Sequence, residues 1–77
     1  GRSEASPVVR MRCARALVEM RRDQREVASV IARAVAWDET VPRHVRCGAA
    51  RDLARWSELM REDARALLVR LRDCGGR

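Results

Sequence analysis

The chain has 77 residues, enough for one domain with a small hydrophobic core. Seventeen arginines and eleven acidic residues, with no lysine, give a net charge of +6, which permits acidic partners, including nucleic acid. Hydrophobic residues make up 47% of the chain, which excludes wholesale disorder. The three cysteines show no CxxC spacing, so we expect reduced thiols and a cytoplasmic location.

The first predicted element is a long helix. We expect residues 1–5 to be a disordered N-terminal segment or the remainder of a tag, and residues 6–77 to form a single helical domain. Ser6 can cap a helix, and Pro7 suits its first position. Apolar residues then recur every three or four positions, which predicts one helix over about residues 7–37: Val9, Cys13, Leu17, Met20, Val27, Ile31 and Ala34.

An alternative is a break at residues 21–24, which would divide this helix in two. The segment is entirely polar but contains neither glycine nor proline, the residues that most often end a helix. We therefore expect the helix to continue through it.

The most apolar stretch of the chain lies at residues 27–37, where only Ser29 and Arg33 are polar. A helix that is apolar nearly all round must be covered on more than one side. The sequence therefore predicts that this helix is central in a bundle, and that a second chain supplies some of the covering helices.

Residues 38–42 predict a turn, with Pro42 in the first turn of the next helix. A second helix is expected over about residues 42–74, because apolar residues again recur every three or four positions. Helices joined by a short connection pack antiparallel. The predicted fold is therefore all-α: a long antiparallel helical hairpin that dimerises into a four-helix bundle.

One set of apolar residues is expected to form the core and the self-association surface. Within it, Trp56 suits the core, whereas Trp37 suits the core and an interface equally. The full set is Val27, Val30, Ile31, Val35, Trp37, Leu53, Trp56, Met60 and Leu67.

Catalysis, metal binding and membrane insertion are not expected. His44 is the only histidine, and no converging acid, base or nucleophile is readable, so we expect no enzyme and no catalytic residue. His44 and Cys47 make one ligand pair where a structural zinc site usually needs four ligands, so we expect neither metal nor cofactor. The longest apolar run is too short to cross a membrane.

A basic stretch in the first predicted helix is the candidate partner surface. It has no helix-turn-helix spacing, and no aromatic residue lies beside its arginines in the sequence. We therefore expect a non-catalytic protein–protein interaction module, a small adaptor, docking or regulatory protein that forms a homodimer and binds an acidic protein. The alternative is nucleic-acid binding through the same arginines: Arg10, Arg12, Arg15, Arg21, Arg22 and Arg25.

Overall fold

The chain is all-helical, as predicted. The computed structural model describes residues 6–75, with side chains from 6 to 72; the expectation for residues 1–5 and the side chain of Cys74 lie outside this part. No strand occurs within residues 6–75. The elements are α1 (Pro7–Met20), the short 3-10 helix η1 (Arg22–Gln24), α2 (Arg25–Ala36), α3 (Arg43–Trp56) and α4 (Arg61–Gly75).

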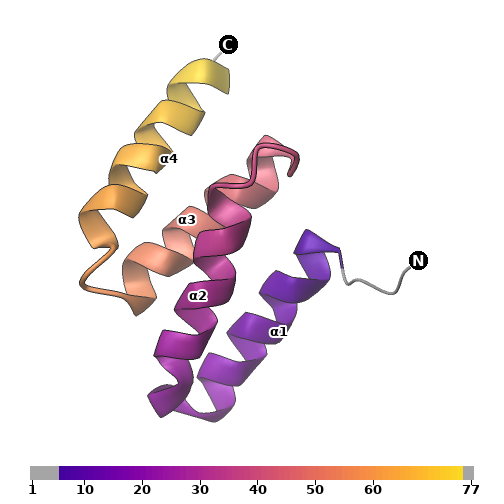
Figure 1. The fold of residues 1–77 in the computed structure, drawn as a ribbon, viewed down its shortest axis with the longest axis vertical. Coiled ribbons are helices and arrows are strands. Elements are labelled where there is room, and N and C mark those ends of the chain that lie inside the picture. The colour runs from indigo at the N-terminus through magenta and orange to yellow at the C-terminus, as the bar shows by residue number, and fades with distance from the viewer. Residues whose placement is uncertain (1–5, 76–77) are drawn as a thin grey trace.

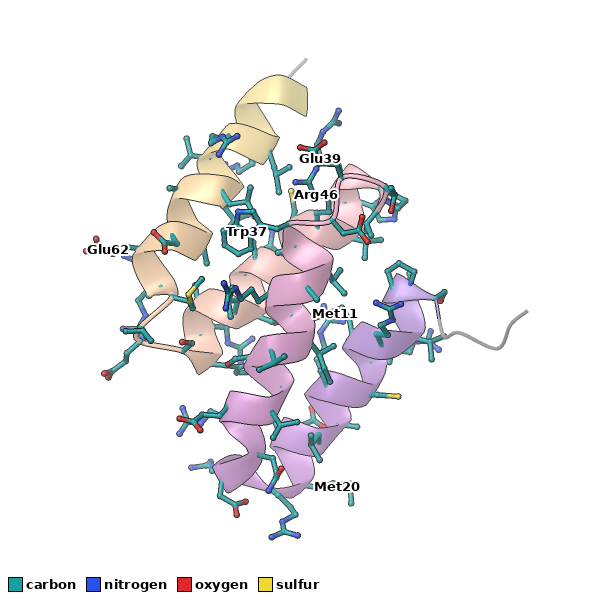
Figure 2. All side chains as sticks on the ribbon, viewed as in Figure 1. Met11, Met20, Trp37, Glu39, Arg46 and Glu62 are labelled. Atoms are coloured by element: carbon teal, nitrogen blue, oxygen red, sulfur yellow. The ribbon has the colours of Figure 1, made fainter. Side chains whose placement is uncertain are left out.

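Both long helices of the predicted hairpin are broken, so the prediction of two helices over 7–37 and 42–74 is wrong. The first break is the alternative at residues 21–24, where Arg21 adopts an extended backbone (φ −143°, ψ 105°). The six polar residues 21–26 offer no apolar side chain to a core. A chain reversal there lets α1 fold back along α2 (Figure 1), and leaves Met20 at the corner, 80% exposed (Figure 2).

The second break lies at Ser57 and was not predicted. Ser57 is extended (φ −131°, ψ 114°) and ends α3. Its Oγ accepts a hydrogen bond from the Met60 backbone N–H at 3.2 Å, which satisfies a donor that would otherwise lack a partner near the start of α4. The chain then reverses, so α4 packs along α3.

The centre of the fold is the crossing of α2 over α3 (Figure 1). Helix α1 packs mainly against α2, α4 packs against α3, and α1 and α4 lie on opposite sides of the crossing. The body measures 37 × 35 × 14 Å. Because helices pack about 8–10 Å apart, a thickness of 14 Å corresponds to two layers of helices.

The core is built mostly from alanine. Leu53 and Val35 are the largest fully buried side chains among those described. Small side chains let helices approach closely, but each buries little apolar area. The alanines with no exposed surface are Ala14, Ala28, Ala32, Ala36, Ala49, Ala50 and Ala64.

The predicted helix start at Ser6 and the turn over residues 38–42 are confirmed, with Pro42 directly before α3 instead of in its first turn. Ser6 caps α1 by accepting a hydrogen bond from the Val9 backbone N–H at 3.3 Å, with Pro7 at the first position. In the turn before α3, Asp38 Oδ1 accepts hydrogen bonds from the Thr40 backbone N–H at 3.0 Å and the Thr40 hydroxyl at 2.6 Å. These two hydrogen bonds lower the pKa of Asp38, the hydroxyl contributing most, with Arg10 and Arg46 adding a smaller electrostatic effect.

Two arginine side chains cap the C-terminal ends of helices by donating hydrogen bonds to backbone carbonyl oxygens. Arg46 Nε donates to the Ala36 carbonyl oxygen at 2.9 Å, at the end of α2. Arg61 Nε donates to the Ala54 carbonyl oxygen at 2.9 Å, in the last turn of α3. A cation at this position satisfies a free carbonyl and complements the helix dipole.

A single carboxylate ties α1 to α3. Asp52 is buried, and its Oδ2 accepts from Arg15 Nε at 2.6 Å, while Arg55 lies 3.8 Å from Oδ1. The Arg15 side chain lies against Gly48, because a Cβ atom added at Gly48 would be 3.3 Å from the Arg15 guanidinium. Helix α3 runs through Gly48 without a break, so this glycine provides room for the ion pair.

We predict that Arg61→Ala lowers the free energy of unfolding by about 1–2 kcal/mol, because α3 loses a charged donor at its last carbonyls. Urea denaturation followed by circular dichroism at fixed protein concentration measures this. Arg65→Ala, on the same helix and exposed, is the matched control and should change stability by less than about 0.5 kcal/mol. Equal losses in both variants would contradict the capping role.

We also predict that Thr40→Val raises the pKa of Asp38 toward its ordinary value of 3.8, because the hydroxyl bond is the largest cause of the lowering. A carboxyl NMR titration of both proteins measures the shift. A lowered folded-state pKa contributes stability above the unfolded-state value and loses it as pH falls through the folded-state value. The variant should therefore lose less stability on acidification, and an unchanged Asp38 pKa would contradict the assignment.

Candidate functional site

An apolar groove separates α2 from α4. Its first part has a volume of about 680 Å³. On one side lie Val30 and Ala34 of α2 and Trp37 directly after it, and on the other lie Met60 directly before α4 and Leu67 within α4. Figure 2 shows Trp37 in the space between the two helices. The helices do not pack directly on each other, so this side of α2 is left open.

The groove continues toward the corner between α3 and α4. A second hollow of about 820 Å³ shares Val30, Arg33 and Met60 with the first and is also lined by Leu53, Trp56 and Leu59. Val30, in the shared part, is 68% exposed, and Leu59 is 91% exposed. We call the two parts together the apolar groove.

Charges of both signs line the apolar groove. Arg33, Arg70 and Asp63 accompany its first part, and Glu26 and Glu58 accompany the second. All five side chains are exposed. A surface that carries both signs around an apolar centre can pair its own charges with those of a second copy.

The residues predicted for the core and the self-association surface lie in different places in the structure: some line the apolar groove and others lie in the core. Six line the apolar groove, although Leu53 is fully buried there. Val35 is buried in the core, and Ile31 packs against it. Val27 is 49% exposed and lies outside the groove, so it is not part of the core of the single chain, and its role in self-association stays a prediction.

A second concave surface lies between α1 and α3, which we call the arginine hollow. One part, of about 400 Å³, is lined by Val18, Glu19, Arg22, Arg25, Arg55 and Trp56. The adjoining part, of about 360 Å³, shares four of these and adds Arg15, Gly48, Arg51 and Asp52. Three separate elements and the η1 corner therefore bring arginines to one place.

The six predicted basic residues do not form one stripe, because the helix that would have aligned them ends at Met20. Arg15, Arg22 and Arg25 reach the arginine hollow, whereas Arg10 and Arg12 do not line it. Arg21 lies 3.6 Å from Asp23 in an exposed ion pair.

Sequence reasoning missed Arg51, Arg55 and Trp56 as members of this basic surface. They lie 26 or more positions from Arg25 along the chain, so only the folded arrangement reveals them. No aromatic residue lies beside the predicted arginines in the sequence, but the fold brings Trp56 to them, since it lines both parts of the hollow.

The remaining reactive side chains are scattered. His44 is exposed at the start of α3, Cys47 is half-buried against the core, and Cys13 is exposed on α1. In the described part of the chain no three histidine, cysteine or acidic side chains gather where they could hold a metal ion. None of the described helices is long and apolar enough to cross a bilayer, and the cytoplasmic location stays a prediction.

Comparisons of the chain with protein-family models, with curated proteins and with solved structures found no match. The two concave surfaces are the features of the fold that bear on function. The apolar groove has charged residues of both signs around it. The arginine hollow is lined by arginines and by Trp56.

Proposed function

We propose that the chain is a non-catalytic protein–protein interaction module that forms a homodimer through the apolar groove. The observation that carries the proposal is the open side of α2, where Val30 is 68% exposed beside Trp37 and Met60. From Val27 to Ala36 the only polar residues of α2 are Ser29 and Arg33, and α1 and α3 cover two sides of this helix. The third side faces the groove.

The small core supports the same proposal. Alanines dominate the buried positions, and larger apolar side chains such as Val30 and Leu59 remain exposed. A short chain with a small core is often stabilised by association. A standard interface buries about 800 Å² per partner, which is roughly a seventh of the chain's surface of 5544 Å².

The charges around the groove favour a second copy as the occupant. In a two-fold dimer each residue i that contacts j is matched by j contacting i. Arg33 and Arg70 on one copy can then face Asp63, Glu26 or Glu58 on the other. A partner with charge of one sign would leave like charges opposed along part of the groove.

We predict that Val30→Asp weakens dimerisation by more than about tenfold, because a carboxylate would be desolvated at the centre of the interface. Sedimentation equilibrium over a range of concentrations measures the dissociation constant against the mass of the 8.8 kDa chain. Because Val30 is exposed in the single chain, its replacement should leave the helix content seen by circular dichroism unchanged.

Val69→Asp is the matched control. Val69 is also an exposed helical valine, at 56%, but it does not line the groove, so its replacement should leave the dissociation constant unchanged. A chain that stays monomeric at every concentration would overturn the proposal. Equal weakening by both variants would show that the interface lies elsewhere.

A further inference from the structure

We propose that the arginine hollow binds single-stranded nucleic acid, with the Trp56 indole as the stacking surface for a base and arginines as phosphate ligands. The inference rests on residues that the groove dimer does not require, apart from Trp56, which borders both surfaces. Because the two surfaces share Trp56, the test below includes a variant that weakens the dimer.

Most of the positive charge in the hollow is not neutralised by the carboxylates that line it. Arg15 is engaged by Asp52 at 2.6 Å, and Arg55 lies at the looser distance of 3.8 Å from the same carboxylate. Arg22, Arg25 and Arg51 form no ion pair with any residue whose side chain is described. Four arginines therefore remain for phosphates, against the single free carboxylate of Glu19.

The arginines of the hollow come from two parts of the fold that meet at Trp56, whose side chain also packs against the core. Arg22 and Arg25 come from the corner between α1 and α2, whereas Arg51 and Arg55 are four residues apart on α3 and share a face of that helix. Trp56 is half-buried and lines both parts of the hollow. Single-strand binding sites combine these two features, a basic groove along the backbone and an aromatic side chain on which bases stack.

The concave shape of the hollow favours single-stranded nucleic acid over a nucleic-acid duplex, and the indole favours it over an acidic peptide. A duplex is read by an element that protrudes into a groove, whereas here the arginines line a hollow. An acidic peptide could use the arginines, but its carboxylates would leave the indole without a stacking partner. Each part of the hollow, at about 400 and 360 Å³, lies within the size range of small-ligand sites, about 300–1,000 Å³.

The test uses the fact that the chain contains two tryptophans and no tyrosine. In a Trp37→Phe variant, Trp56 is the only tryptophan, so stacking of a base should quench its fluorescence. Titration with an oligothymidylate of about 12 nucleotides, within the range of known single-strand sites, should give saturable quenching. With four phosphates neutralised, the logarithm of the binding constant should fall with the logarithm of salt concentration with a slope of about −3.

Single substitutions locate the site. Arg22→Gln, Arg25→Gln and Arg55→Gln should each weaken binding roughly three- to tenfold and reduce the magnitude of the salt slope by about 0.7. Glu19→Gln should strengthen binding, because it removes the carboxylate that repels phosphate. Arg65→Gln is the control: it removes the same charge from an exposed position on α4 outside the hollow, and should have little effect.

Four outcomes would overturn the proposal: no binding, equal weakening by Arg65→Gln, tighter binding of a duplex of the same length without quenching, or equal binding and quenching by oligoglutamate. The last would assign the hollow to an acidic protein instead. The same titration with the Val30→Asp variant shows whether a monomer binds. Loss of binding there would tie the hollow to the dimer, contrary to the separation proposed here.

Discussion

The fold depends on how closely α2 crosses α3. The buried residues at the centre include Ala32 and Ala36 of α2 and Ala49 and Ala50 of α3, none of which has exposed surface. A methyl group is the largest side chain at these positions, so the two helices can approach closely, but little apolar area is removed from water. The larger apolar residues Val30 and Trp37 are therefore left at the flank of the crossing, where they line an open groove.

The helical content, the capped start at Ser6 and the turn before α3 could all be predicted from the sequence, because each depends on local chemistry. The two chain reversals could not be predicted from periodicity. At residues 21–26 six consecutive polar residues indicated the break. The helix ends there even though the segment contains no glycine or proline. At Ser57 the signal was a serine able to cap α4, but it lay within a continuous apolar series and was read as part of one helix.

Residues of the apolar groove could be selected from the sequence, whereas the arginine hollow could be recognised only in the folded chain. Val30, Trp37 and Met60 could be selected from the sequence because they are large and apolar and lie in predicted helices. The arginine hollow requires residues from α1, the η1 corner and α3, which approach one another only after the first reversal. The hollow as it stands combines Arg22 of the η1 corner with Arg51 and Arg55 of α3 around Trp56.

Three of the arginines have structural roles, so the net charge by itself does not indicate an anionic partner. Neither α2 nor α3 ends in a residue with positive φ, and none occurs in the part of the chain that the structure describes. Arg46 and Arg61 supply the donors that such a terminus would otherwise provide, and Arg15 holds α1 to the buried Asp52. These three cations are committed to the fold. An anionic partner is therefore favoured by the convergence of the remaining arginines beside Trp56 in a concave surface, and not by the net charge of +6.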